Sequence, residues 1–358
     1  MREEYDHGHD IFKIDIRNAF NEINIGSILS ALKSNEKLHF LIPHFRFLYE
    51  KDTSFLFKKG EHRATLSRSR GVIQGHCLSS ALFCLGINET LLRVQSGFRA
   101  RDVSVMSYAD DIFVSGPVGH IVQAAGDLIR GLGSECQLSV SRDKMTILID
   151  EDNYPGVSLD AEDALREEGL TCKIVDTGLE ACGVPIGKAD FVSTFCSKNV
   201  ESYQSLYERL RFVKSNQVRL ALLSRCFAHK MSFLMKCLPS AEIMDALESH
   251  MLLIKLCLTE VFANGDADYV LPESVWNQEF LPTYEGGLGI LNVVELAPMY
   301  YVGSVANAVR VRDGLRGVAV YPPALDRLFK DFHVRPELPD DGVVTYQMSQ
   351  FACLLLST

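Results

Sequence analysis

Residues 103–114 read VSVMSYADDIFV, with two adjacent carboxylates, Asp110 and Asp111, near their centre. Apolar residues on both sides of the acidic pair predict two short strands joined by a tight turn. Two neighbouring carboxylates at the tip of a hairpin repel each other unless a cation neutralises them. The stretch therefore predicts a metal site on a β-hairpin.

Two other short segments carry residue types that suit the same site. Asp15 ends a strand-like alternation over residues 11–16, and GVIQG at residues 71–75 precedes a helical stretch. Phosphoryl transfer through two divalent ions needs carboxylates from separate elements, with the metals about 4 Å apart. Asp15 and Asp110 would supply them, and oxygen ligands favour Mg²⁺ or Mn²⁺ over zinc. Alternatively, Asp15 caps a helix and Asp110 lies in an ordinary turn, with no metal bound at either.

The order of the elements indicates an α+β fold, in which an antiparallel sheet is backed by helices. Apolar residues recur at helical intervals over residues 26–49, 78–94, 118–132 and 202–262. We expect residues 150–168 to form a polar surface loop or insertion, because they are acidic and rich in turn residues.

Composition narrows the class of protein. With 358 residues, 47% of them hydrophobic, the chain is long enough for a substantial core. It contains no apolar run of membrane-spanning length and begins with charged residues, so we expect no membrane partner and an intracellular, nuclear or cytoplasmic location. The ten cysteines form no CxxC pair, which favours reduced core thiols over a zinc or disulfide framework.

The net charge of -10 is unusual for a nucleic-acid-binding protein, but it is unevenly distributed. Residues 1–150 carry 18 Lys and Arg against 18 Asp and Glu, so the acidic excess lies entirely in the remainder. Within that remainder, residues 209–236 contain no acid. Their basic side chains form either a solvated helix face or a track for a phosphate backbone, for which the candidates are Arg209, Arg211, Lys214 and Arg219.

The three segments together, in this order, resemble the palm motifs of the reverse transcriptases, and among them the non-LTR retrotransposon type. KIDIRNAFNEI (13–23) is similar to motif A, SRGVIQGHCLSSALF (69–83) to motif B and SYADDIFV (107–114) to motif C. Further similarity lies in LSVSRDKMTIL (138–148), CGVPIG (182–187) and LPTYEGGLGILNVVELAPMYYVGSVA (281–306). The resemblance implies a polymerase palm with partial fingers over residues 1–197 and a mainly helical thumb-like or connection-like region over residues 198–358.

The resemblance also implies a role for each site residue. Asp15, Asp110 and Asp111, with the carbonyl of Ile16, would hold two Mg²⁺ or Mn²⁺ ions. Lys144 would neutralise or protonate the leaving pyrophosphate; its alternative is a plain surface lysine.

Four other residues would contact the substrates. Phe20 would exclude a 2′-hydroxyl and so select deoxynucleotides, although ordinary core packing is its alternative. Gln74 and Gly75 would lie against the templating base and the incoming nucleotide, the alternative for Gln74 being a helix-capping amide. Tyr108 would face the primer terminus.

The chain departs from the family pattern in two places. Motif B has His76-Cys77 where a proline is frequent, and motif A begins within fifteen residues of Met1, so we expect the usual preceding fingers segment to be missing. We also expect no endonuclease before the palm and no ribonuclease H after it. A basic cluster between motifs A and B could bind nucleic acid: Lys58, Lys59, His62, Arg63, Arg68 and Arg70.

Three functions are compatible with these residues. The first is an RNA-directed DNA polymerase, truncated from a retrotransposon, that uses an RNA template to add deoxynucleotides to the 3′-hydroxyl of a DNA primer. The second is a catalytically inactive descendant that binds nucleic acid or serves as a scaffold. An RNA-dependent RNA polymerase is the third, and both Phe20 and the Tyr108-Ala109 pair before the acids disfavour it.

Overall fold

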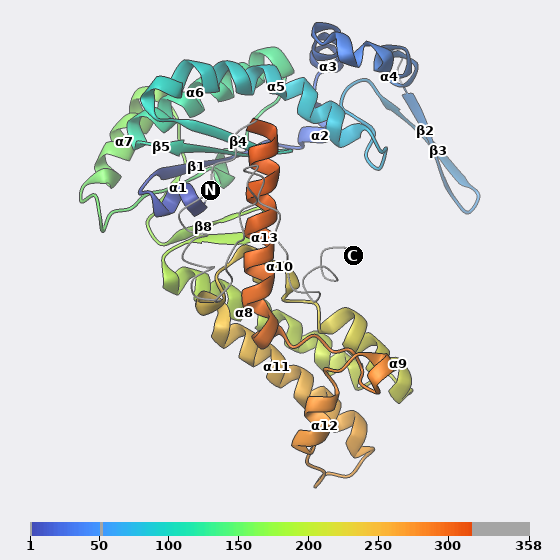
Figure 1. Ribbon diagram of the computed structural model, residues 1–358. Coiled ribbons are helices and arrows are strands. Elements are labelled where there is room, and N and C mark those ends of the chain that lie inside the picture. The colour runs from blue at the N-terminus through green and yellow to red at the C-terminus, as the bar shows by residue number, and fades with distance from the viewer. Residues whose placement is uncertain (1, 51–52, 317–358) are drawn as a thin grey trace, which may run out of the picture. The chain divides into compact units, whose positions relative to one another are not determined.

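The computed structural model of the chain describes residues 2–50 and 53–316. It divides into two compact units, residues 1–188 and 189–358 (Figure 1). The expected palm-to-thumb division at residues 197/198 falls within helix α8 (Ala189–Leu210), nine residues after this division. The functional assignment of the two parts stays a prediction.

The first unit is built on a five-stranded sheet. Its strand order is β4 (Ser104–Tyr108), β5 (Asp111–Gly116), β1 (Asp10–Asp15), β6 (Thr146–Leu148) and β7 (Lys173–Val175). Three of the four pairings are antiparallel, and β6 with β7 is parallel. The predicted α+β class, with a mainly antiparallel sheet, is confirmed.

The two faces of the sheet have different coverings. Alternate residues of a strand point to opposite faces, and Phe12 and Ile14 belong to the main core, to which α5 (Ser79–Phe98) and α6 (Val118–Cys136) contribute. Ile11 lies on the other face and packs with Leu179 and Ile186. These two residues belong to a second hairpin, β8 (Gly178–Ala181) and β9 (Val184–Gly187). The hairpin therefore covers the face that also carries Asp15.

The remaining elements of the first unit are short. They are α1 (Arg2–Asp6), α2 (Ala19–Glu22), α3 (Ile25–Ser34), η1 (Glu36–Leu41), α4 (Ile42–Tyr49), β2 (Thr53–Lys59), β3 (His62–Arg68), η2 (Arg99–Arg101), η3 (Arg142–Lys144) and α7 (Val157–Glu168). Strands β2 and β3 pair only with each other among the described strands. They were not predicted from the sequence.

Helix α7 corrects the expectation of a polar loop over residues 150–168. Val157, Ala161 and Leu165 recur every four residues, so they form one face of a helix, and all three are buried in the main core. The acidic residues between them are mostly exposed and dominate the composition. The four-residue spacing of the apolar residues was the one signal of this helix in the sequence, and the acidic composition obscured it.

The second unit is helical throughout its described residues. It comprises α8 (Ala189–Leu210), α9 (Asn216–Leu222), a π-helical turn η4 (Leu223–Phe227), α10 (Ser232–Cys237), α11 (Ser240–Ala263), α12 (Glu273–Gln278), η5 (Thr283–Glu285) and α13 (Val293–Arg316). Helix α8 packs on α11, and α10 packs on α13. Within residues 2–50 and 53–316, no helix combines the length and the apolar character that crossing a membrane requires.

Candidate active site

Asp15 and Asp111 face each other across two strands. They form the last register pair of the antiparallel β1–β5 ladder, and both side chains are partly buried. Directly opposite residues share one face of a sheet, with their Cβ atoms about 4.5–5.5 Å apart, and like charges there are destabilising. The fold thus holds two carboxylates where a cation would relieve their repulsion.

The tight turn predicted at Asp110 is confirmed. Tyr108 pairs with Asp111, which leaves Ala109 and Asp110 as a two-residue connection between β4 and β5. Ala109 has a φ of 54°, the left-handed conformation that such turns demand and that a non-glycine residue adopts at a cost. Asp110 and Tyr108 are both exposed at this tip, the tyrosine by 75%.

Lys144 lies beside the acidic pair. Its Nζ is 3.3 Å from Oδ2 of Asp15. Backbone bonds fix this loop against the end of β1: the amide of Ser141 donates to the carbonyl of Asp15 at 2.8 Å, and Ile16 bridges to Val140. The structure therefore brings the predicted lysine to the predicted carboxylate, although they are 129 residues apart in the chain.

The donor chemistry of this site fits a hard cation. Asp15 and Asp111 offer carboxylate oxygens, which Mg²⁺ and Mn²⁺ prefer. Within the described part of the chain, however, no three His, Cys, Asp or Glu side chains converge into a metal-binding group. The carboxylates thus meet as a pair, and the full predicted set of Asp15, Ile16, Asp110 and Asp111 stays a prediction.

The segment before α5 is tied to the element that follows Asp15. The amide of Gly71 donates to the carbonyl of Ile23 at 2.9 Å, and that of Val72 donates to the carbonyl of Phe20 at 2.7 Å. Gly71 has a φ of 75°, and an added Cβ would lie 2.3 Å from the carbonyl oxygen of Asn21, so only glycine fits here. Beyond this anchor, Gln74 and Gly75 are exposed.

Phe20 has a packing role in this structure. Its ring stacks on that of the fully buried Phe83, with the ring centroids 4.8 Å apart. The side chain is only partly buried, so one side remains accessible. Packing against α5 holds the ring in place, and its predicted role in sugar selection stays a prediction.

Cys182 is a neighbour of the site for which the sequence predicted no role. It lies at the turn of the β8–β9 hairpin, and its Sγ donates to Oδ2 of Asp111 over 3.8 Å. Burial, followed by the negative charge of Asp111, raises the pKa of the Cys182 thiol. The Cys182-Gly183 turn was visible in the sequence, but its contact with Asp111 depends on tertiary packing. The nine cysteines in the described residues are all free.

The proposed basic track of the second unit is partly neutralised. Arg211 makes two hydrogen bonds to the carboxylate of Glu260, and Arg219 lies 3.7 Å from the same carboxylate. Among the described residues, the side chains of Arg209 and Lys214 form no hydrogen bond or ion pair and are exposed. The acid-free run in the sequence thus has an acidic neighbour, supplied by α11.

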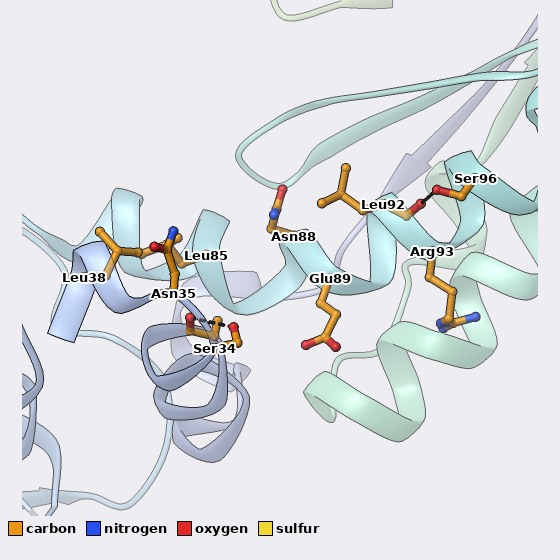
Figure 2. Close-up of a pocket in the computed structure, with 10 residues that line it drawn as sticks. Ser34, Asn35, Leu38, Leu85, Asn88, Glu89, Leu92, Arg93 and Ser96 are labelled. Atoms are coloured by element: carbon orange, nitrogen blue, oxygen red, sulfur yellow. Dashed lines mark hydrogen bonds between the residues drawn. The ribbon is translucent and has the colours of Figure 1, made fainter.

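A cavity of about 450 Å³ lies apart from these residues. It is lined by residues from α3 and α5, including Ser34, Leu85, Glu89 and Leu92 (Figure 2). None of the predicted site residues lines it. The carboxylate pair lies elsewhere, at the end of the β1–β5 ladder.

Known proteins with similarity to this chain include two solved telomerase structures. No curated protein matches the chain. Among solved structures, apo telomerase from Candida tropicalis matches with a TM-score of 0.44 and 12% identity, over 92% of this chain and 54% of that one. Telomerase from Candida albicans, with a fragment of telomeric RNA, gives a TM-score of 0.42 and 12% identity, over 92% and 52%. The chain thus spans about half the length of these proteins.

The family comparison concerns the part of the chain that carries the carboxylates. The matched segment includes β1, α5, the β4–β5 hairpin and Lys144. The segments at 182–187 and 281–306 lie outside it. Residues 5–159 match the model of the family described as reverse transcriptase (RNA-dependent DNA polymerase).

Proposed function

We propose that the first unit is the catalytic part of an RNA-directed DNA polymerase of the non-LTR retrotransposon type. The observation that carries this proposal is the cross-strand pair of Asp15 and Asp111, with Lys144 at 3.3 Å from Asp15, inside the segment that matches the reverse transcriptase family. The substrates would be an RNA template, a DNA primer and deoxynucleoside triphosphates, in the nucleus or cytoplasm.

Asp15 and Asp111 would hold divalent Mg²⁺ or Mn²⁺, with Asp110 and the carbonyl of Ile16 completing a site for two ions. When bound, they would supply positive charge to neutralise the negative charge that develops as the primer 3′-hydroxyl attacks the α-phosphate and pyrophosphate leaves. Lys144 would deliver positive charge or a proton to the pyrophosphate, because its ammonium group can exchange Asp15 for the leaving group. The ion pair between Lys144 and Asp15 supports this role in a phosphoryl transfer.

The exposed residues around this pair would position the substrates. Tyr108 at the hairpin tip would contact the primer terminus, and Gln74 with Gly75 would contact the template base and the nucleotide. Phe20, held by Phe83, would present the accessible side of its ring to the sugar. Basic residues of the second unit, Arg209 and Lys214, would contact the nucleic-acid backbone.

Primer extension by the full chain tests this proposal. The assay uses an RNA template, a labelled DNA primer, deoxynucleotides and Mg²⁺ or Mn²⁺. We expect Asp15→Asn and Asp110→Asn each to lower extension by about 10²-fold or more, as when one transition-state stabiliser is removed. Asp143→Asn is the control, because Asp143 is exposed beside Lys144 and forms no ion pair within the described residues. Equal extension by the unmodified chain and Asp15→Asn would overturn the proposal.

A second candidate is a reverse-transcriptase-derived protein that binds nucleic acid without catalysis. It is favoured by the convergence of the carboxylates as a pair, with no group of three or more among the described residues. Binding of a primer–template that persists without any metal-dependent extension would support this function. Extension that requires metal and is abolished by Asp15→Asn would exclude it.

A further inference from the structure

The β2–β3 hairpin, residues 53–68, is a ribbon that carries a cation on each face near its turn. Cross-strand partners share a face, and the register pairs Lys58 with Arg63 and Lys59 with His62. Successive residues alternate between faces, so one face presents Lys58 and Arg63 while the other presents Lys59 and His62. Lys58 and Arg63 are cations placed directly opposite each other, so they repel, as two opposed carboxylates do.

These charges have no counterion among residues 2–50 and 53–316. Lys58, Lys59 and Arg63 are exposed, and their side chains form no ion pair or hydrogen bond with any residue that the structure describes. Glu61, in the turn, is the only acid between residues 53 and 70. The tip of the ribbon is therefore a concentrated, unneutralised positive patch.

Apolar side chains accompany the cations. Leu56 is 67% exposed and precedes Lys58 on one face, while Phe57 is 57% exposed and precedes Lys59 on the other. An exposed phenylalanine beside cations suits an unpaired base, since the ring can stack on the base while the cations contact neighbouring phosphates. In a base-paired duplex the base faces are stacked on each other, so a duplex would contact only the cations of the ribbon.

The basic residues at the foot of the ribbon have structural partners instead. The guanidinium of Arg68 donates to the carbonyl of Gly71 and lies 4.8 Å from the ring centre of Tyr49. Arg70 forms an ion pair with Glu22 at 2.6 Å. These partners hold Arg68 and Arg70 against the rest of the first unit, whereas the cations at the tip remain available to a ligand.

We propose that the tip of the β2–β3 ribbon binds a single strand of nucleic acid, with Lys58, Lys59 and Arg63 on its phosphates and Phe57 stacked on a base. This contact deepens the proposed function and rests on it, because it adds a second surface for the nucleic-acid substrates of the proposed polymerase, on a sheet separate from that of the carboxylates. RNA and DNA single strands share the required phosphates and unpaired bases. Separate RNA and DNA arms of the test distinguish these two sources.

Fluorescence anisotropy with labelled 20-nucleotide strands tests the ribbon. In the full chain, we expect the triple variant Lys58→Gln, Lys59→Gln, Arg63→Gln to raise Kd for a single strand by about 10- to 100-fold at low salt, because three phosphate contacts are lost. The slope of log affinity against log salt should become shallower by about 2, given roughly 0.7 per phosphate on a single strand. Phe57→Ala should raise Kd by about tenfold with no change in this slope.

The matched control removes the same charge elsewhere in the first unit. Lys33, Lys37 and Arg99 are exposed, and their side chains form no ion pair within the described residues, so their joint replacement by Gln should leave Kd unchanged. Circular dichroism of each variant confirms that it is folded. Weaker binding of the triple variant to the RNA strand, the DNA strand or both supports the proposal. It also shows whether the ribbon accepts ribose, deoxyribose or both.

Other outcomes overturn it. Unchanged single-strand binding by the triple variant does so, as does an equal loss for a base-paired duplex. Loss of binding to vesicles of anionic lipid, with single-strand binding intact, would instead identify a membrane contact. Primer extension by the unmodified chain separates this inference from the proposed function. If the unmodified chain does not extend a primer but its single-strand binding depends on the ribbon, only catalysis is refuted. If it extends a primer and loses extension in Asp15→Asn, but binds single strands independently of the ribbon, only the ribbon contact is refuted.

Discussion

Two hairpins of the first unit each bring a charged side chain opposite another of the same sign, in different surroundings. The β4–β5 hairpin brings Asp111 opposite Asp15, and the β2–β3 ribbon brings Lys58 opposite Arg63. Asp111 lies in a five-stranded sheet whose two faces are covered by core, and Lys144 lies near its partner Asp15. The ribbon has two strands, and its turn is exposed on both faces.

This difference in surroundings explains how the fold accommodates the repulsion within each like-charge pair. Surrounding structure holds the carboxylates together, so their arrangement exists before any ligand arrives, as a catalytic centre needs. An isolated two-stranded hairpin is only marginally stable, and water solvates its cations. We therefore expect the acidic pair to be rigid and the basic pair to be ordered by its ligand.

Gly71 joins the two regions, and its replacement should have the largest effect. Its carbonyl accepts from Arg68 at the foot of the ribbon, and its amide is bonded to Ile23 beyond Asp15. A Cβ at this position would lie 2.3 Å from a backbone oxygen at a φ of 75°. We expect Gly71→Ala to lower the free energy of unfolding by about 3–5 kcal/mol, through overpacking and backbone strain.

Urea unfolding, monitored by circular dichroism, measures this effect. Gly75→Ala is the matched control, since Gly75 also has a positive φ, 84°, but nothing lies within 4 Å of an added Cβ. Backbone strain alone should cost about 1–2 kcal/mol there. Equal midpoints for the two variants would show that the Gly71 anchor does not connect the regions.

Asp10 lies at the other end of β1 and is a buried carboxylate for comparison with Asp15. Asp15 has Lys144 beside it and Asp111 opposite it. Asp10 is 7% exposed, and its Oδ1 has no hydrogen-bond partner among the described residues. Burial raises the pKa of Asp10 from 3.8 to about 6. Between these two pH values the folded state retains a proton that the unfolded state releases, so stability should rise as the pH falls from 6 to 4.

Asp10→Asn should remove this pH dependence, because it replaces the ionised carboxylate with a neutral amide. Above pH 6 the variant should be more stable by about 2–3 kcal/mol, the free energy that corresponds to the pKa shift. Thermal unfolding at pH 4, 5, 6 and 7.5 provides the measurement. A stability difference between variant and unmodified chain that stays constant from pH 4 to 7.5 would refute the buried-carboxylate explanation.

Lys58→Glu should have the smallest effect on stability, and it should increase stability. It converts the repulsive pair with Arg63 into an attractive cross-strand pair, which should stabilise the ribbon by about 0.5 kcal/mol. Amide hydrogen exchange in residues 56–65 should then slow about twofold. Lys33→Glu is the control, and faster exchange in the Lys58→Glu ribbon would refute the repulsion.

Part of the site was predictable because its chemistry is local. Asp15 follows an alternating strand, and Asp110-Asp111 lies in a turn between apolar runs, so each could be assigned to an element by its neighbours. Helix α7 was missed because acidic residues mask the spacing of Val157, Ala161 and Leu165. The ribbon was missed although Gly60-Glu61 is a two-residue turn, since its basic residues suggested a cluster without indicating strands.

The sequence by itself determined which residue types are available and which element each joins, because local spacing controls strand and helix formation. It therefore yielded the strand ending at Asp15, the acidic turn and the α+β class. Only tertiary structure decided that Asp111 faces Asp15, that Lys144 and Cys182 lie beside them, and that Glu260 neutralises Arg211. These contacts join residues 49 to 129 positions apart, and only strand register and helix packing bring such distant charges together.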